Sequence, residues 1–171
     1  EGALPSLIAL LSSTDERIQE QAAVSLRNLS VNPQNEIQIV QDGGLRPLIA
    51  LLRSANEKVV RQAAGALANV TVNPKNKIKL VQASGLGPLV ALLKHPDDKV
   101  IFKFSILPLV LLMFLCLQIK EHAAGAIRNV SMNQELEGDI TREGALAPLI
   151  DLMDHTEPKI QIQAAVSVRN L

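Results

Sequence analysis

Three observations in the sequence predict an all-α solenoid built from about four repeated units. The string GGLRPLIALL at Gly43–Leu52 returns as SGLGPLVALL at Ser84–Leu93. Related strings occupy Gly2–Leu11 and Gly144–Met153, and an alanine-rich block follows each copy. Within these blocks apolar residues recur at intervals of three and four, which is typical of a helix buried along one face. Because a single unit of this kind cannot bury its apolar face alone, the units are expected to stack.

The alanine-rich blocks mark the units. They read EQAAVSLRNLS from Glu20, RQAAGALANVT from Arg61, EHAAGAIRNVS from Glu121 and IQAAVSVRNL from Ile162. Their asparagines stand at positions 28, 69, 129 and 170, so two spacings are equal and the middle one is longer. We therefore expect one domain over residues 1–171, with units of about 1–33, 34–74, 75–133 and 134–171 and an insertion at 100–118.

Each unit is predicted to hold a short, a medium and a long helix. The leucine-rich string forms the medium helix. After it, Ser13-x-x-Glu16 and Ser54-x-x-Glu57 fit the capping box that satisfies the free amides at the start of a helix. The long helix follows, and in the first unit its buried stripe consists of Ile18, Ala22, Ala23, Leu26 and Leu29.

Local sequence motifs also predict the short helix and the turn after it. Asn32-Pro33 and Asn73-Pro74 are expected to open the short helix, where proline costs no hydrogen bond. Gly43-Gly44 and Ser84-Gly85 fall where the short helix must end and the next medium helix begin, and glycine tolerates the left-handed conformation of such turns.

This combination of motifs resembles the armadillo repeat. The pattern is a period near 41 in which GxLxPLIxLL is followed by QAAxxLRNL, and EHAAGAIRNVS is similar to units of plant and vacuolar armadillo proteins. The resemblance covers nearly the whole chain except the insertion. It implies a right-handed armadillo superhelix of about four three-helix repeats, the first and last incomplete, whose long helices line a concave groove.

The candidate binding residues lie on one face of the predicted long helices. An asparagine recurs once per unit, and its carboxamide offers donors and an acceptor at regular intervals that suit the backbone of an extended peptide. The resemblance implies that this asparagine contacts the ligand, as it does in the family. The alternative is a structural role, in which the side chain hydrogen-bonds the neighbouring backbone. The candidates are Asn28, Asn69, Asn129 and Asn170, with Gln21, Gln62, His122 and Gln163 on the same helix face and Arg27, Arg128 and Arg169 beside them.

The arginines are interpreted either as partners of acidic ligand side chains or as ordinary solvated surface. The tryptophan that import adaptors of this family place four residues before the asparagine is absent. Its positions hold Val24, Gly65, Gly125 and Val166, so a basic nuclear-localisation peptide is not the expected ligand.

Composition excludes several function classes. The net charge is zero and neither Trp nor Tyr occurs, which argues against nucleic-acid binding. Three histidines and the single cysteine, Cys116, form no metal set. We expect no enzyme, no cofactor and no small-molecule substrate. A lone cysteine cannot form an internal disulfide, which favours the reducing cytoplasm or nucleus.

The sequence therefore predicts a scaffold or adaptor that binds an extended segment of a partner protein in the groove. The alternative is the substrate-recognition region of a U-box ubiquitin ligase whose catalytic part lies outside these residues. No U-box is present in this chain.

The insertion, VIFKFSILPLVLLMFLCLQ at Val100–Gln118, has three interpretations. A membrane span is not expected, because Phe104–Leu117 is shorter than the roughly 20 residues that a span needs and contains Pro108. A long surface loop is rarely so apolar. The third is a translated intron: removing the segment joins Lys99 to Ile119 and aligns the unit without a gap to its neighbour, and removing 101–119 aligns equally well. If the segment folds, we expect it to extend or precede the long helix of the third unit and to be poorly buried.

Overall fold

The computed structural model describes residues 2–94 and 107–171, the side chains of 107–115 excepted. All regular structure in this part of the chain is helical, as the sequence predicts. The elements are α1 (Ala3–Leu10), α2 (Glu16–Leu29), α3 (Pro33–Gln41), α4 (Leu45–Leu51), α5 (Glu57–Val70), α6 (Pro74–Gln82), α7 (Leu86–Leu93), α9 (Leu107–Ser131), η1 (Gln134–Leu136), α10 (Glu137–Arg142), α11 (Leu146–Met153) and α12 (Pro158–Asn170).

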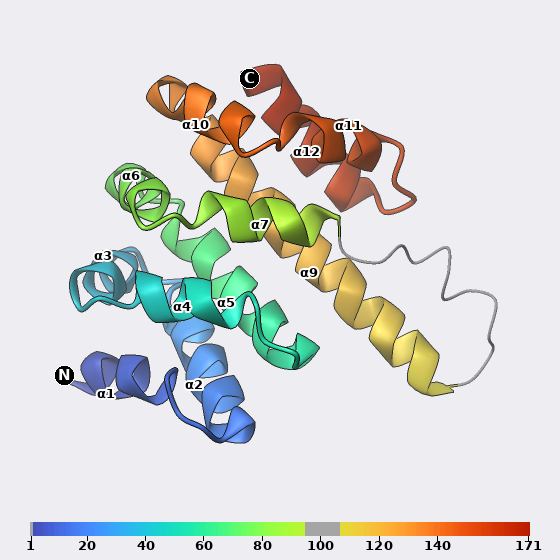
Figure 1. Ribbon diagram of the computed structural model, residues 1–171. Helices are drawn as coiled ribbons and strands as arrows, with labels where there is room; N and C mark the ends of the chain where they lie inside the picture. Colours follow the sequence, from blue (N-terminus) through green and yellow to red (C-terminus); the bar gives the residue numbers. More distant parts are fainter. Residues whose placement is uncertain (1, 95–106) are drawn as a thin grey trace.

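The helices stack in three rows (Figure 1). The long helices α2, α5, α9 and α12 pack side by side in that order. A medium helix packs on each long one: α1 on α2, α4 on α5, α7 on α9 and α11 on α12. The short helices α3, α6 and α10 lie along one edge of the stack. Each unit therefore contacts its sequence neighbours, which is the architecture of an α-solenoid.

The long helices begin differently from the prediction. The N-cap of α2 is Asp15, whose carboxylate accepts from the Arg17 amide at 2.8 Å, and the N-cap of α5 is Asn56. Ser13 instead accepts from the Asp15 amide at 3.1 Å, and the helix starts only at Glu16. The predicted capping boxes are wrong because the serine oxygen bonds the amide two residues on, a competing local turn.

The short helices begin as predicted. Asn32 caps α3 and Asn73 caps α6, and a proline is the first helical residue in both. The turn after α3 uses Gly43 at φ 84°, whereas the corresponding turn after α6 places Ser84, not Gly85, at φ 58°. Gly85 is needed for a different reason: a Cβ there would lie 2.5 Å from Leu80 Cδ1.

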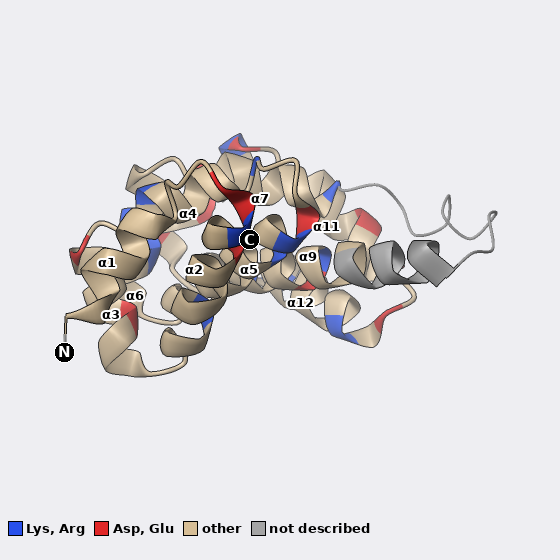
Figure 2. Ribbon diagram, turned by 90° about the horizontal axis from the view of Figure 1, so that it is seen from below, with Lys and Arg blue, Asp and Glu red and all other residues tan. Residues whose placement is uncertain are grey.

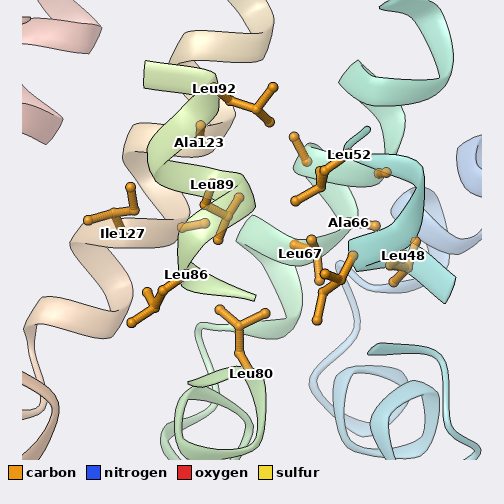
Figure 3. Close-up of a cluster of buried hydrophobic side chains, with 14 of the residues drawn as sticks. Leu48, Leu52, Ala66, Leu67, Leu80, Leu86, Leu89, Leu92, Ala123 and Ile127 are labelled. Atoms are coloured by element: carbon orange, nitrogen blue, oxygen red, sulfur yellow. The ribbon is translucent and has the colours of Figure 1, made fainter. Parts of the chain in front are cut away.

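The core runs the length of the stack, between the rows of medium and long helices. Figure 3 shows Leu89 of α7 between Leu67 of α5 and Ile127 of α9, and all three are fully buried. Burying a side chain of this size contributes about 1.5–3 kcal/mol, so the core holds neighbouring units together as well as each unit. The paired alanines Ala63-Ala64 and Ala123-Ala124 are buried too and let α5 and α9 pack closely.

The end of the insertion continues directly into the long helix of the third unit. α9 starts at Leu107 and has 25 residues, against 14 in α5, so the expected extension of the helix is confirmed for 107–118. Cys116 is 2% exposed, so the expected poor burial is wrong at this position. The first residues of the insertion lie outside the described part. No described helix combines the length and the apolar character that crossing a membrane requires.

Candidate binding groove

The four candidate asparagines occupy the last turn of the four long helices. Asn69 Nδ2 donates to the Arg27 carbonyl oxygen at 3.1 Å and to Ser30 Oγ at 3.0 Å, both at the end of the preceding long helix. Asn129 Nδ2 repeats this contact with the Ala68 carbonyl oxygen at 3.0 Å and Thr71 Oγ1 at 3.4 Å. In both residues the amide nitrogen thus joins one unit to the unit before it.

The other end of the same carboxamide is open. An amide nitrogen carries two hydrogens, and at Asn69 two acceptors take them. Its Oδ1 accepts from no described residue, and it is not among the buried atoms that lack a partner, so solvent reaches it. The same holds for Asn129 Oδ1. In these two residues the group left open to solvent is therefore a hydrogen-bond acceptor and not a donor.

The outer asparagines differ from this pair. Asn170 Nδ2 donates to Ser131 Oγ at 3.2 Å, and its Oδ1 accepts from Arg169 at 3.4 Å. Asn28 is exposed, and its side chain forms no hydrogen bond with a described residue. Sequence reasoning missed the hydroxyls that receive these amides. The sequence does contain a pattern that could have predicted them. A serine or threonine stands two residues after each of the first three asparagines: Ser30, Thr71 and Ser131.

The predicted glutamines and arginines also meet, across units. Arg27 Nη1 donates to Gln62 Oε1 at 3.0 Å, and Arg128 Nη1 donates to Gln163 Oε1 at 3.2 Å. Gln21, in the first described long helix, is exposed. An arginine in one unit thus donates a hydrogen bond to the glutamine of the next, a partner that carries no charge.

The pair is missing between α5 and α9, where Ala68 replaces the arginine and His122 replaces the glutamine. His122 Nε2 is buried without a hydrogen-bond partner in the described part of the chain. Burial, and then the charges of Arg27 and Arg61, lower the pKa of His122 to about 4. The imidazole is therefore neutral at neutral pH.

The missing arginine leaves space in the same row. Arg27 lies across Gly65 of α5, where an added Cβ would stand 2.7 Å from Arg27 Nε. At the equivalent Gly125 of α9 an added Cβ would meet nothing within 4 Å. Gly65 thus allows a close contact with Arg27 at the α2–α5 junction, whereas the space over Gly125 at the α5–α9 junction is unfilled.

An open hollow of about 690 Å³ lies between α9 and α12. It brings together three of the predicted residues, Arg128, Arg169 and Asn170, with the apolar side chains of Met132, Ile162 and Val166. Met132 and Ile162 are 59% and 60% exposed, so this hollow is an apolar surface in contact with water, bordered by two guanidinium groups.

Basic and acidic side chains are mixed along the described part of the chain (Figure 2). Arg27, Arg128 and Arg169 form no ion pair with a described carboxylate, and neither does Lys77 of α6. Burial, and then the charge of Arg128, lower the pKa of Lys77. Arg61 and Lys77 were not among the predicted site residues. The position of Arg61 holds glutamate or isoleucine in the other units, and Lys77 lies on the short helix α6. No group of residues suited to hold a metal ion occurs in the described ranges.

Comparison with known proteins agrees with this architecture. Residues 1–31, 32–72, 73–103 and 133–171 match the Armadillo/beta-catenin-like repeat. Among curated proteins no match was found.

Solved structures extend the likeness over the whole chain. The crystal structure of an engineered protein is similar with a TM-score of 0.83 and 28% identity over 99% of this chain, which spans only 62% of that protein's length. A second engineered protein has a TM-score of 0.61 and 27% identity, covering 99% of this chain and 81% of its own. A designed armadillo repeat protein in complex with peptide (KR)4 has a TM-score of 0.58 and 24% identity, with 99% and 82% covered. From the repeat matches and the stacked three-helix units, the chain belongs to the armadillo/beta-catenin-like repeat family.

Proposed function

We propose that this chain is a protein-interaction scaffold that binds an extended segment of a partner protein along α2, α5, α9 and α12. The observation that carries the proposal is the pair of solvent-accessible acceptors, Asn69 Oδ1 and Asn129 Oδ1, at equivalent positions of adjacent units. Both carboxamides are held in place by their amide nitrogens, so the acceptors are preorganised for a ligand.

An extended peptide suits the spacing of such acceptors. Packed helices lie about 8–10 Å apart, and an extended chain rises ~3.3 Å per residue. The distance from one long helix to the next therefore corresponds to about two to three residues of an extended ligand. Backbone N–H groups recur at this spacing whatever the side chains are. Each net hydrogen bond is worth only about 0.5–1.5 kcal/mol, so affinity has to come from the series of units.

The absence of tryptophan from the groove separates this chain from a binder of lysine-rich peptides. Gly65 and Gly125 offer no aromatic face, and Arg27, which lies across Gly65, repels a basic ligand. The peptide in the designed relative is basic by its name, so that ligand is not carried over to this chain. The U-box alternative concerns residues outside the chain, and nothing described here favours it.

The proposal is tested with a displayed random library of peptides long enough to cross all four long helices in an extended conformation. Selected peptides are mapped by NMR on the ¹⁵N-labelled chain. We expect shift changes in the side-chain amides of Asn69 and Asn129 and in the C-terminal halves of α5, α9 and α12. Methylating the peptide nitrogens that face the two acceptors should weaken binding by about 2- to 10-fold per nitrogen.

Two results would contradict the proposal. One is a failure to select any peptide that binds the folded chain. The other is a set of selected peptides whose shift changes gather on α1, α4, α7 and α11, the row opposite the long helices.

A further inference from the structure

The hollow between α9 and α12 combines an exposed apolar floor with a basic rim. Its floor contains Met132, Ile162 and Val166, and the first two are more than half exposed. Arg128 and Arg169 border it, and none of the residues that line it is acidic. An apolar surface that stays in water in the free chain is stabilised when a ligand covers it.

The two arginines lack an internal counter-charge. Arg128 donates to the neutral Gln163, and Arg169 contacts only the neighbouring Asn170, at 3.4 Å. The ion pairs Arg142–Asp139 and Lys159–Glu121 do not include either arginine. The electrostatic complement of this rim is therefore a carboxylate supplied from outside the chain.

We propose that the α9–α12 hollow is a specificity subsite for an aliphatic side chain flanked by acidic residues in an extended partner segment. This inference rests on the proposed function and names the ligand chemistry of that groove. The aliphatic side chain covers Met132, Ile162 and Val166, while the flanking carboxylates pair with Arg128 and Arg169. Asn170 at the edge continues the row of asparagines along which the segment lies.

The subsite also has a defined position along the groove. The preceding junction, between α5 and α9, lacks the arginine because Ala68 stands there. No side chain covers Gly125, and His122 is neutral. The acidic preference is therefore absent from the α5–α9 junction and does not extend evenly over the groove.

The experiment uses the full chain and four synthetic peptides of equal length, each long enough to cross the four long helices. The first has a central leucine flanked by glutamates. The other three replace the glutamates by glutamines, the glutamates by lysines, or the leucine by alanine. We expect the first to bind roughly tenfold more tightly than the glutamine and alanine peptides, more tightly still than the lysine peptide, and to weaken as salt is added.

Protein variants locate the effect. Ile162→Glu and Arg169→Gln change exposed positions, so folding is expected to persist, which circular dichroism checks. Ile162→Glu should weaken the acidic peptide by about tenfold or more, and the glutamine peptide, which keeps the leucine, to a smaller extent. Arg169→Gln should weaken the acidic peptide by about threefold and change the glutamine peptide little. Arg46→Gln, an exposed arginine on α4, is the matched control and should leave all four affinities unchanged.

The outcomes separate this inference from the proposed function. If the peptides bind the groove without preference for glutamate and leucine, or if the hollow variants bind like the parent, the subsite is refuted while the scaffold function stands. If no extended peptide of any charge binds along the long helices, both proposals fail.

Discussion

At the residue scale, the asparagine carboxamide has one bonded end and one open end. Its nitrogen bonds the end of the preceding helix, and its oxygen stays open to solvent. The sequence left two interpretations, a ligand contact or a structural bond. The described contacts of Asn69 and Asn129 supply the structural bond, and the ligand contact stays a proposal for the remaining oxygen.

Replacing Asn129 by alanine is expected to lower the free energy of unfolding by about 1–3 kcal/mol, because the Ala68 carbonyl and Thr71 hydroxyl lose their donor. Asn28→Ala is the matched control, since Asn28 is exposed and its side chain forms no hydrogen bond with a described residue. It should change stability by less than about 0.5 kcal/mol. Urea unfolding measures both. Equal effects of the two substitutions would mean that the inter-unit bond contributes nothing.

His122 predicts a pH dependence of stability. Its pKa is lowered to about 4 in the folded chain, below the ordinary 6.5, so the unfolded chain binds the proton more readily. The contribution of the neutral His122 to the free energy of unfolding is therefore fully present above about pH 6.5 and is lost as the pH drops toward 4. The expected loss from pH 7 to pH 5 is at most about 2 kcal/mol.

His122→Gln, which restores the residue found at Gln62 and Gln163, should remove this part of the pH dependence and leave the part due to carboxylates. Urea unfolding of both proteins at the two pH values isolates the histidine. An unchanged difference between pH 7 and pH 5 would show that His122 titrates normally in the folded chain.

At the element scale, α9 shows how a repeat tolerates an insertion. Ile119 is fully buried, as is Val59 at the equivalent position of α5, so the register of the repeat resumes there. Upstream of this point Gln118 Oε1 accepts from Arg61 at 2.9 Å. The helix continues because leucine, methionine and phenylalanine tolerate helical backbone, and Pro108 stands in its first turn.

Deleting Val100–Gln118 should leave the packed part of α9 in place, since Lys99 then precedes Ile119 and Asp97 aligns with the N-cap residue Asn56. We expect a protein that is at least as stable and more soluble, because a strongly apolar segment has been removed. Thermal unfolding and solubility measurements check this. Sequencing of transcripts should show Lys99 joined to Ile119; a deletion variant of lower stability, with only the long transcript present, would contradict the intron hypothesis.

At the scale of the whole molecule, stability is distributed over the junctions between units, because the main contacts between described helices of different units join neighbouring units. The arginine–glutamine pair strengthens two of the three long-helix junctions, α2–α5 and α9–α12. The central junction lacks it. This makes the junction of α5 and α9 the place where an added interaction is expected to stabilise the array.

The double substitution Ala68→Arg and His122→Gln should install the missing pair. The new arginine should lie across Gly125 in the same way that Arg27 lies across Gly65, because the space over Gly125 is free. We expect the two changes together to stabilise the chain by about 0.5–1.5 kcal/mol more than their separate effects add up to. A double-mutant cycle by urea unfolding measures this coupling, and strictly additive effects would show that no pair forms.

By itself, the sequence determined the repeat, the helix types and the face that carries the asparagines. These follow from local patterns: the apolar spacing, the Asn-Pro starts of α3 and α6, and the recurrence of the blocks. Helix starts that depend on competing side-chain bonds were predicted wrongly, as at Ser13 and Asp15, because both residues are good caps and only the backbone geometry selects one.

Only the tertiary structure decided what the repeated side chains touch. Asn69 bonds Arg27 and Ser30, which belong to the preceding unit, and no local pattern encodes a contact over that separation. The same is true of the hollow between α9 and α12, where Arg128 and Arg169 meet with Ile162. The physical reason is that periodicity fixes which face of a helix a residue occupies, whereas its neighbours depend on how one helix is set against the next.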